Sequence, residues 1–265
     1  MNTEFSSATS VVQSNPAQDT PHTAIPATVV PAKERLIVAL DFPSAERAME
    51  LVDRLDGSCL WFKVGMELYY ATGNHLVEQL VERGFKVFLD LKMHDIPNTV
   101  SKAMRSVAEV GASLLTVHAT GGEHMLKAVV DAAAEVPNAP KLLAVTVLTS
   151  MDAAELRAVG VFDTPASQVL RLSRLARATG IDGLVCSAEE VEAVRAAMGP
   201  EMMLVVPGIR PSSSAGRRDD QRRVAAPAQA IALGASKLVV GRPITQAANP
   251  AAAVAEILAE IESAS

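Results

Sequence analysis

Short aliphatic runs alternate with helical patterns from Arg35 to the end of the chain. Eight runs rich in Leu, Val and other apolar residues predict strands at 36–40, 60–64, 86–91, 114–118, 142–148, 183–186, 203–206 and 237–240. Between them, apolar residues recur three and four positions apart, which is the spacing of one helical face. These segments predict helices at 45–55, 76–83, 100–110, 125–134, 166–179, 188–198, 227–233 and 251–261.

The strand pattern also predicts the fold class. Runs that are apolar at every position are typical of strands covered on both faces, as in a parallel sheet. Eight strand–helix units in about 230 residues favour an α/β protein with a closed (β/α)₈ TIM barrel over an open doubly wound sheet. No G-x-G-x-x-G follows the first strand, which argues against dinucleotide binding. We therefore expect one catalytic barrel domain over residues 34–265.

Residues 1–33 differ in composition from the rest of the chain. They are rich in Ser, Thr, Ala and Pro, and prolines at intervals prevent a long helix. The segment has neither the basic start and apolar block of a secretory signal nor the Arg-rich pattern of a transit peptide. We expect a disordered leader that the chemistry does not need, and a cytoplasmic protein.

Composition and charge limit the kinds of molecule that we expect the protein to bind. Hydrophobic residues make up 49% of the chain and aromatic residues only 3%, so the core must be mainly aliphatic. The formal charge of −6 argues against general binding to nucleic acid or to anionic membranes. No apolar stretch approaches the roughly 20 residues that span a bilayer. Cys59 and Cys186 have no paired or zinc-binding spacing, so we expect buried thiols, no metal and no cofactor.

Polar residues follow almost every predicted strand. In a TIM barrel the carboxyl ends of the strands form the active-site rim. The residues at these ends are Asp41, Lys63, Asp90, Lys92, His118, Thr149, Ser150, Ser187, Gly208, Arg210, Gly241 and Arg242. Charged residues are rarely buried without pairing or function, so this set predicts a site at one end of the barrel.

The densest polar cluster lies in residues 88–99. Asp90 and Lys92 are two positions apart on a strand, so their side chains point the same way. Asp95 follows in the loop, and Lys63 on the neighbouring strand can join them. Charges alternating in this way keep each group ionised, so Lys92 should be an ammonium suited to donating a proton. The alternative is a purely structural salt-bridge network.

A second cluster surrounds the ends of the last two strands. Gly241 lets the backbone approach a ligand, and Arg242 can bind phosphate oxygens. Phosphate sites in these barrels frequently lie at this place. Residues 211–223 carry four arginines, two aspartates and three serines without apolar periodicity. This composition suits a mobile lid, with an ordinary solvated loop as the alternative.

Residues 90–99 resemble the D-x-K-x-x-D-I-P-x-T signature of the orotidine 5′-phosphate decarboxylase family. Further matches follow in the family's order at 39–41, 62–65, 145–150, 207–211, 220–223 and 240–245. The resemblance covers residues 35–262. It implies conversion of orotidine 5′-phosphate to UMP and CO₂, the last step of de novo pyrimidine synthesis, without metal or cofactor.

The resemblance also implies residue roles. Lys92 would protonate C6 of the pyrimidine beside Asp90, while Asp41 and Lys63 would contact the ribose hydroxyls and help to hold the charge array. Thr149 and Ser150 would face the pyrimidine, and Asp95 and Thr99 would reach into the partner's site of a homodimer with shared active sites. The remaining residues implied to bind substrate are Ile96, Pro207, Arg210, Gln221, Gly241 and Arg242.

Two other functions stay open at this stage. One is a related magnesium-dependent sugar-phosphate decarboxylase or aldolase-like synthase built on the same barrel, which shares the D-x-K-x-x-D core. Ile96, Pro97 and Thr99, together with Asp220 and Gln221, argue against it. The other is a nucleotide-binding regulator without catalytic activity, which the intact acidic and basic residues of the core motif argue against.

Overall fold

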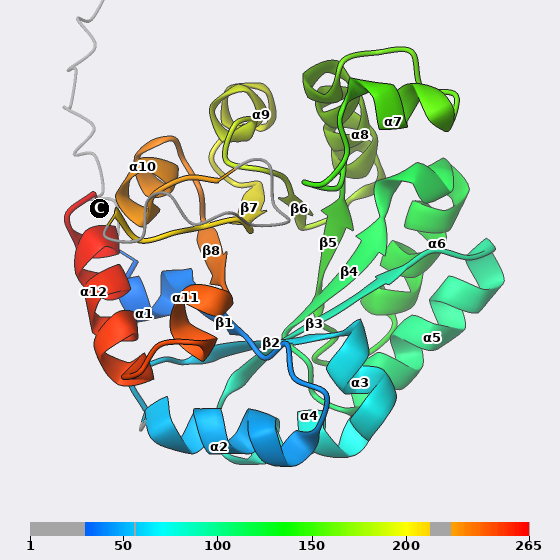
Figure 1. Ribbon diagram of the computed structural model, residues 1–265. Helices are drawn as coiled ribbons and strands as arrows, with labels where there is room; N and C mark the ends of the chain where they lie inside the picture. Colours follow the sequence, from blue (N-terminus) through cyan, green and yellow to red (C-terminus); the bar gives the residue numbers. More distant parts are fainter. Residues whose placement is uncertain (1–29, 56, 213–223, 265) are drawn as a thin grey trace, which may run out of the picture.

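The computed structural model describes residues 30–55, 57–212 and 224–264. Eight parallel strands pair in chain order, and β8 closes the barrel against β1 (Figure 1). The strands are β1 (Leu36–Ala39), β2 (Trp61–Gly65), β3 (Lys86–Met93), β4 (Leu114–His118), β5 (Lys141–Val145), β6 (Gly183–Val185), β7 (Met203–Val206) and β8 (Lys237–Val240). The (β/α)₈ barrel predicted from the sequence is confirmed.

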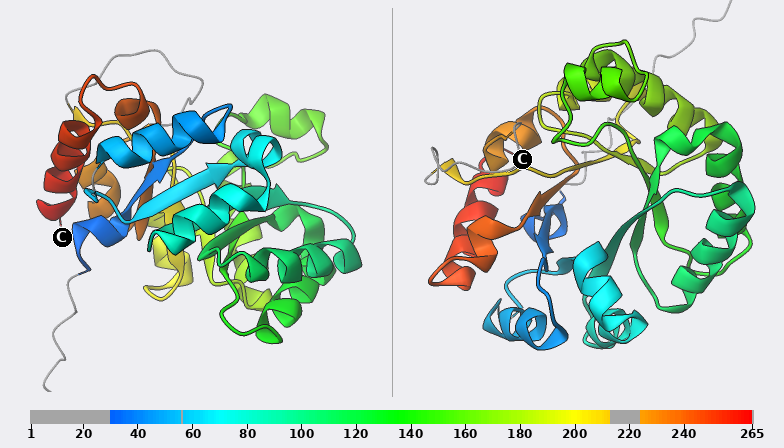
Figure 2. Two further views of the ribbon diagram at one scale, coloured as in Figure 1. Left: turned by 90° about the horizontal axis from the view of Figure 1, so that it is seen from below. Right: turned by 45° about the vertical axis from the view of Figure 1, so that its right-hand side comes forward.

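Helices lie outside the strands in every view (Figures 1 and 2). Those matching the predicted helices are α2 (Ala45–Leu55), α4 (Asn74–Glu82), α5 (Pro97–Glu109), α6 (Gly122–Ala134), α8 (Pro165–Thr179), α9 (Val191–Met198), α10 (Pro227–Ala232) and α12 (Pro250–Glu262). Pro97 occupies the first turn of α5, as expected from its missing N–H group. The helix patterns thus predicted the outer layer to within a few residues.

Several short helical segments were not predicted from the sequence. They are α1 (Ala32–Arg35), α3 (Met66–Thr72), α7 (Ala153–Ala158), α11 (Arg242–Thr245) and the 3₁₀ turn η1 (Ala119–Gly121). Strand β5 also ends at Val145 rather than at 148. The Thr146 N–H and hydroxyl both donate to the Val185 carbonyl oxygen, at 3.3 and 2.8 Å, and the chain then leaves the ladder.

The core has two layers that follow the alternation of side chains along each strand. Strand residues such as Val38, Phe62 and Leu89 pack outward with the helices in the large core. Their neighbours form a smaller cluster inside the barrel: Ile37, Ala39, Trp61, Phe88, Leu114, Leu143, Val205 and Val239. The residues that point into the barrel form one row along each strand, which we call the inward row. Continued by two-residue steps, this row gives the side chains that lie at the carboxyl end of the strand.

The amino ends of the strands are closed by a polar cluster around Trp61. The Trp61 indole N–H donates to Glu34 of α1 at 2.9 Å, and Glu34 also binds Lys86 at 2.9 Å. The Lys237 ammonium lies 3.9 Å from the centre of the Trp61 ring. Burial lowers the pKa of Lys237 to about 8 although Glu34 opposes this shift. These contacts join α1, β2, β3 and β8 at the amino ends of the strands.

The fold begins slightly earlier than the sequence suggested. Helix α1 includes residues 32 and 33, which we had assigned to the leader, and the Ala32 side chain is buried. The rest of the predicted leader, up to residue 29, lies outside the described residues. No helix in the described parts of the chain is long and apolar enough to cross a membrane. Both cysteines are buried free thiols, as expected.

Candidate active site

The inward row of each strand leads to one cavity at the carboxyl ends. Along β1 the row runs from Ile37 through Ala39 to Asp41, and along β2 it runs from Trp61 to Lys63. The cavity has a volume of about 270 Å³. It is lined by Ala39, Asp41, Lys63, Phe88, Asp90, Lys92, Val145, Val147, Leu148, Thr149, Val185, Cys186, Pro207, Gly208, Arg210, Val239, Gly241 and Arg242. Residues from seven strand ends therefore converge on one site.

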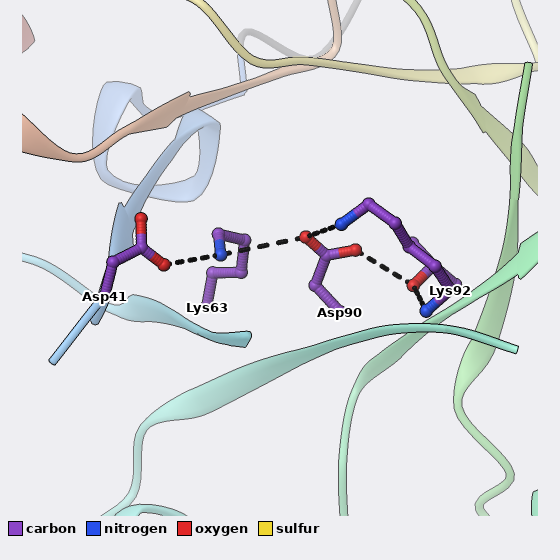
Figure 3. A network of polar contacts seen from close by, with 5 residues as sticks. Asp41, Lys63, Asp90 and Lys92 are labelled. Atoms are coloured by element: carbon purple, nitrogen blue, oxygen red, sulfur yellow. Dashed lines mark hydrogen bonds and ion pairs between the residues drawn. The ribbon is translucent and has the colours of Figure 1, made fainter. Parts of the chain in front are cut away.

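Four charged side chains stand in a row across this cavity (Figure 3). The Lys63 Nζ lies 3.0 Å from Asp41 Oδ1 and 3.7 Å from Asp90 Oδ2. The Lys92 Nζ lies 2.8 Å from the same Asp90 Oδ2. We call Asp41, Lys63, Asp90 and Lys92 the charge row. Its signs alternate as predicted, with Asp41 at the Lys63 end, whereas Asp95, which was expected to follow Lys92 at the other end, instead accepts the Ile96 N–H.

Asp90 is the most enclosed member of the row, with only 9% of the residue exposed. Burial raises the pKa of its carboxyl, but the charges of Lys63 and Lys92 and the hydrogen bonds from Lys92 and Thr116 outweigh burial and lower the pKa below its usual value. Asp90 is therefore a carboxylate at neutral pH. Its contribution to stability is present above the unfolded-state pKa and is lost as the pH falls through the lowered folded-state pKa.

An irregularity in β3 lies where the Asp90 and Lys92 side chains form their ion pair. The pairing with β4 shifts between Leu89 and Met93, and Lys92 has a φ of +49° in the left-handed region. The Thr116 hydroxyl on β4 donates to Asp90 Oδ1 at 3.0 Å and accepts the Lys92 backbone N–H at 2.8 Å. The Thr116 hydroxyl thus accepts the Lys92 N–H in place of the backbone carbonyl that regular strand pairing would supply.

The ends of β7 and β8 form the part of the cavity lining next to β1, because β8 pairs with β1. Gly241 precedes the short helix α11, and Arg242 opens that helix. Arg210 is held at the rim because its backbone N–H donates to the Ala225 carbonyl at 3.0 Å, next to a bridge between Ile209 and Ala225. Most of the predicted lid, including Gln221, lies outside the described residues. Arg210, Gly241 and Arg242 converge on the cavity of the charge row.

Comparison with known proteins gives a consistent match. The model of the orotidine 5′-phosphate decarboxylase / HUMPS family matches residues 34–257. The chain belongs to this family.

Curated relatives named orotidine 5′-phosphate decarboxylase are about half identical to the chain. That of Halorhodospira halophila is 51% identical, covering 89% of this chain and 99% of the relative. That of Chromobacterium violaceum is 50% identical, covering 85% and 91%. The crystal structure of the Lactobacillus acidophilus orotidine 5′-phosphate decarboxylase aligns with a TM-score of 0.77 and 40% identity, over 86% of this chain and 99% of that one.

Other members of the family signature lie outside this cavity. Asp95, Ile96 and Thr99 are exposed on the rim, and 66% of Ile96 is accessible. Asp95 Oδ1 accepts the Ile96 N–H at 2.7 Å, and within the described residues it forms no ion pair with Lys92. Ser150 is also exposed and does not line the cavity, whereas Thr149 does.

The sequence did not lead us to predict the apolar residues that line the cavity. Val145, Val147, Val185 and Val239 line it together with Phe88. They follow the same two-residue period that brings Asp41 and Lys63 inward, so extending the alternation to the strand ends would have found them. Thr116 was also missed, because it lies inside a run that reads as core.

Proposed function

We propose that this protein converts orotidine 5′-phosphate to UMP and CO₂. The observation that carries the proposal is the charge row in a cavity that is also lined by apolar side chains and by Arg242. Relatives that share about half of the sequence carry the name of this enzyme. The reaction would place the protein at the end of de novo pyrimidine synthesis, and its cytoplasmic location stays a prediction.

The chemistry needs a positive charge where a negative charge develops. When the bond from C6 to the carboxylate breaks, CO₂ leaves and the electron pair stays on C6. The Lys92 ammonium stabilises this carbanion by its charge and then transfers its proton to C6. Asp90 holds the ammonium in place through the 2.8 Å ion pair. Repulsion between Asp90 and the departing carboxylate is a secondary contribution, because ground-state destabilisation is a contested explanation.

The other residues implied to bind substrate would contact different parts of it. Asp41 and Lys63 bind the ribose hydroxyls, while Thr149, Ser150 and Pro207 face the pyrimidine. The phosphate is bound by Gln221, Gly241 and Arg242, with Arg210 at the base of the lid. Binding energy from the phosphate, which is remote from C6, contributes to organising the site for the transition state.

We propose that the reaction uses no metal ion. Both Asp90 oxygens already accept hydrogen bonds, from the Lys92 ammonium and the Thr116 hydroxyl. A cation at this carboxylate would stand next to the two ammonium groups of Lys63 and Lys92, which repel it. This arrangement favours the metal-free reaction over the magnesium-dependent alternative from the same barrel group.

A direct assay tests the proposed function. Purified protein should deplete orotidine 5′-phosphate, followed by the ultraviolet absorbance change as UMP forms, at the same rate with and without EDTA. Loss of activity in EDTA, restored by Mg²⁺, would favour the magnesium-dependent alternative. Binding of UMP without any turnover would instead favour a nucleotide-binding regulator.

Arg242 provides a test of the phosphate assignment. We expect Arg242→Ala to raise KM and to lower kcat/KM by about 10²-fold or more, because a charge-assisted contact worth about 3 kcal/mol is lost. Steady-state kinetics measure both constants. As a control, orotidine without its phosphate should be processed equally by the variant and the wild type. An unchanged kcat/KM for the phosphorylated substrate would contradict the role.

We further propose a symmetric homodimer with shared active sites. Asp95 and Thr99 point out from the rim of their own subunit, and exposed apolar side chains accompany them at the ends of β2 and β3: Met66, Tyr70 and Ile96. Exposed apolar groups of this size are suited to a protein interface. Asp95 of one subunit would then complete the site that holds Lys92 of the other.

Subunit mixing tests the shared site. Lys92→Ala and Asp95→Ala dimers should each be impaired, whereas an exchanged mixture should recover about a quarter of wild-type activity, because half of the dimers are mixed and each has one intact site. Light scattering should give twice the chain mass. A monomeric mass, or a mixture no more active than its components, would argue against shared sites.

A further inference from the structure

Thr116 occupies an unusual position in the barrel. On β3 and β4, Leu89 pairs with Leu115 and Met93 pairs with Val117. Three residues of β3, Asp90, Leu91 and Lys92, are therefore accommodated opposite the single residue Thr116. The extra length is a bulge, and such irregularities re-aim side chains next to active sites. The left-handed φ of Lys92, +49°, lies within this bulge.

The Thr116 hydroxyl makes two hydrogen bonds whose directions are fixed. A backbone N–H only donates and an ionised carboxylate only accepts. The hydroxyl must therefore accept from the Lys92 N–H, at 2.8 Å, and give its single proton to Asp90 Oδ1, at 3.0 Å. Thr116 is fully buried, so water does not compete for either bond. One side chain thus joins the backbone of Lys92 to the carboxylate of Asp90.

These bonds divide the two oxygens of Asp90 between different partners. Oδ1 is held by Thr116, which leaves Oδ2 turned toward the amines of Lys92, at 2.8 Å, and Lys63, at 3.7 Å. Rotation of the carboxylate would break the Thr116 bond and move Oδ2 away from both amines. The hydroxyl therefore fixes the geometry of the charge row from behind, without lining the cavity.

We propose that Thr116 is a positioning residue for the decarboxylation, one that aligns Lys92 and Asp90 before substrate binds. This inference rests on the proposed function. Preorganised charge is effective because it needs no rearrangement as the carbanion forms. Without the hydroxyl, the Lys92 N–H loses its buried acceptor and the strained backbone at Lys92 is no longer held.

The proposed role of Thr116 predicts a change in the pH dependence of kcat/KM, because Thr116 contacts Asp90 among other charged groups. Lys63 and Lys92 face the carboxylate, Asp41 faces Lys63, and His118 lies on the same strand as Thr116. The Thr116 hydrogen bond is one of the contributions that lower the pKa of Asp90 against the effect of burial. Removing it should raise that pKa, so the acid limb of the kcat/KM profile should move to higher pH.

The experiment compares Thr116→Val, which keeps the shape and removes the hydroxyl, with Thr116→Ser, which keeps the hydroxyl. We expect Thr116→Val to lower kcat about ten- to a hundredfold, from the worth of a hydrogen bond to a charged group. KM should change little, and the acid limb should shift upward. Thr116→Ser should restore both. Thr179→Val is the matched control, because it removes a buried hydroxyl bonded to the Leu175 and Ala176 carbonyls of α8, away from the charge row.

A second readout does not depend on activity. Hydrogen exchange of the peptide containing Lys92 should be faster in Thr116→Val and normal in Thr116→Ser and Thr179→Val. If Thr116→Val fails to fold, Thr116→Ala must show the same kinetic and exchange changes. Wild-type kcat and pH profile in a folded variant without the hydroxyl would overturn the role of Thr116. An inactive wild type would instead overturn the proposed function.

Discussion

Lys92→Ala should abolish decarboxylation while the barrel stays folded. The substitution removes both the charge that stabilises the carbanion and the proton that C6 receives. General acid catalysis contributes about 10²- to 10⁴-fold, and one preorganised electrostatic donor about 10²- to 10³-fold. We therefore expect kcat to fall by about 10⁴-fold or more. Single-turnover and steady-state assays of UMP formation measure this loss.

Two controls make the result specific to the position of Lys92. Lys127→Ala removes an exposed lysine paired with Asp131 on α6, at 2.6 Å, and should leave kcat unchanged. Circular dichroism and UMP binding should show that Lys92→Ala is folded. The Lys92 side chain is only partly enclosed, with 28% of it exposed, so its removal leaves a small defect. Turnover within tenfold of the wild type would remove Lys92 from the mechanism.

Asp90→Asn should be the most destabilising change in the charge row. It keeps the shape of the side chain but leaves the ammonium groups of Lys63 and Lys92 beside each other without the shared carboxylate. Removing one partner of a buried ion pair costs about 3–5 kcal/mol, because the remaining charge is uncompensated. We expect a loss of this size in the free energy of unfolding from urea titrations at neutral pH, together with a large loss of kcat.

An exposed ion pair offers the matched control. Asp53 binds Arg83 at 2.8 Å with 65% of the Asp53 side chain exposed, so Asp53→Asn should cost less than about 1 kcal/mol. The difference between the wild type and Asp90→Asn should persist across neutral pH. It should shrink in acid, as the pH falls through the lowered folded-state pKa of Asp90. Equal destabilisation by both substitutions would show that the charge row contributes little to stability.

Local sequence signals were sufficient for the architecture. Continuous aliphatic runs such as 203–206 and 237–240 coincide with β7 and β8, because strands covered on both faces need apolar residues at every position. Helix α2 was predicted with its observed bounds, since three turns give enough apolar repeats to define a face. Four-residue helices such as α11 were not predicted, because one turn has no period to detect.

The sequence by itself determined that Asp41, Lys63, Asp90 and Lys92 meet at one end of a barrel, because strand alternation and parallel pairing leave no other place for them. The tertiary structure decided the contacts at the two ends of the row and behind it. It placed Asp41 beside Lys63, left Asp95 bonded to the Ile96 N–H rather than to Lys92, and placed the Thr116 hydroxyl behind Asp90. These contacts depend on the register of neighbouring strands and on a bulge at Lys92, which are set by packing across the barrel and which no local pattern in a single strand records.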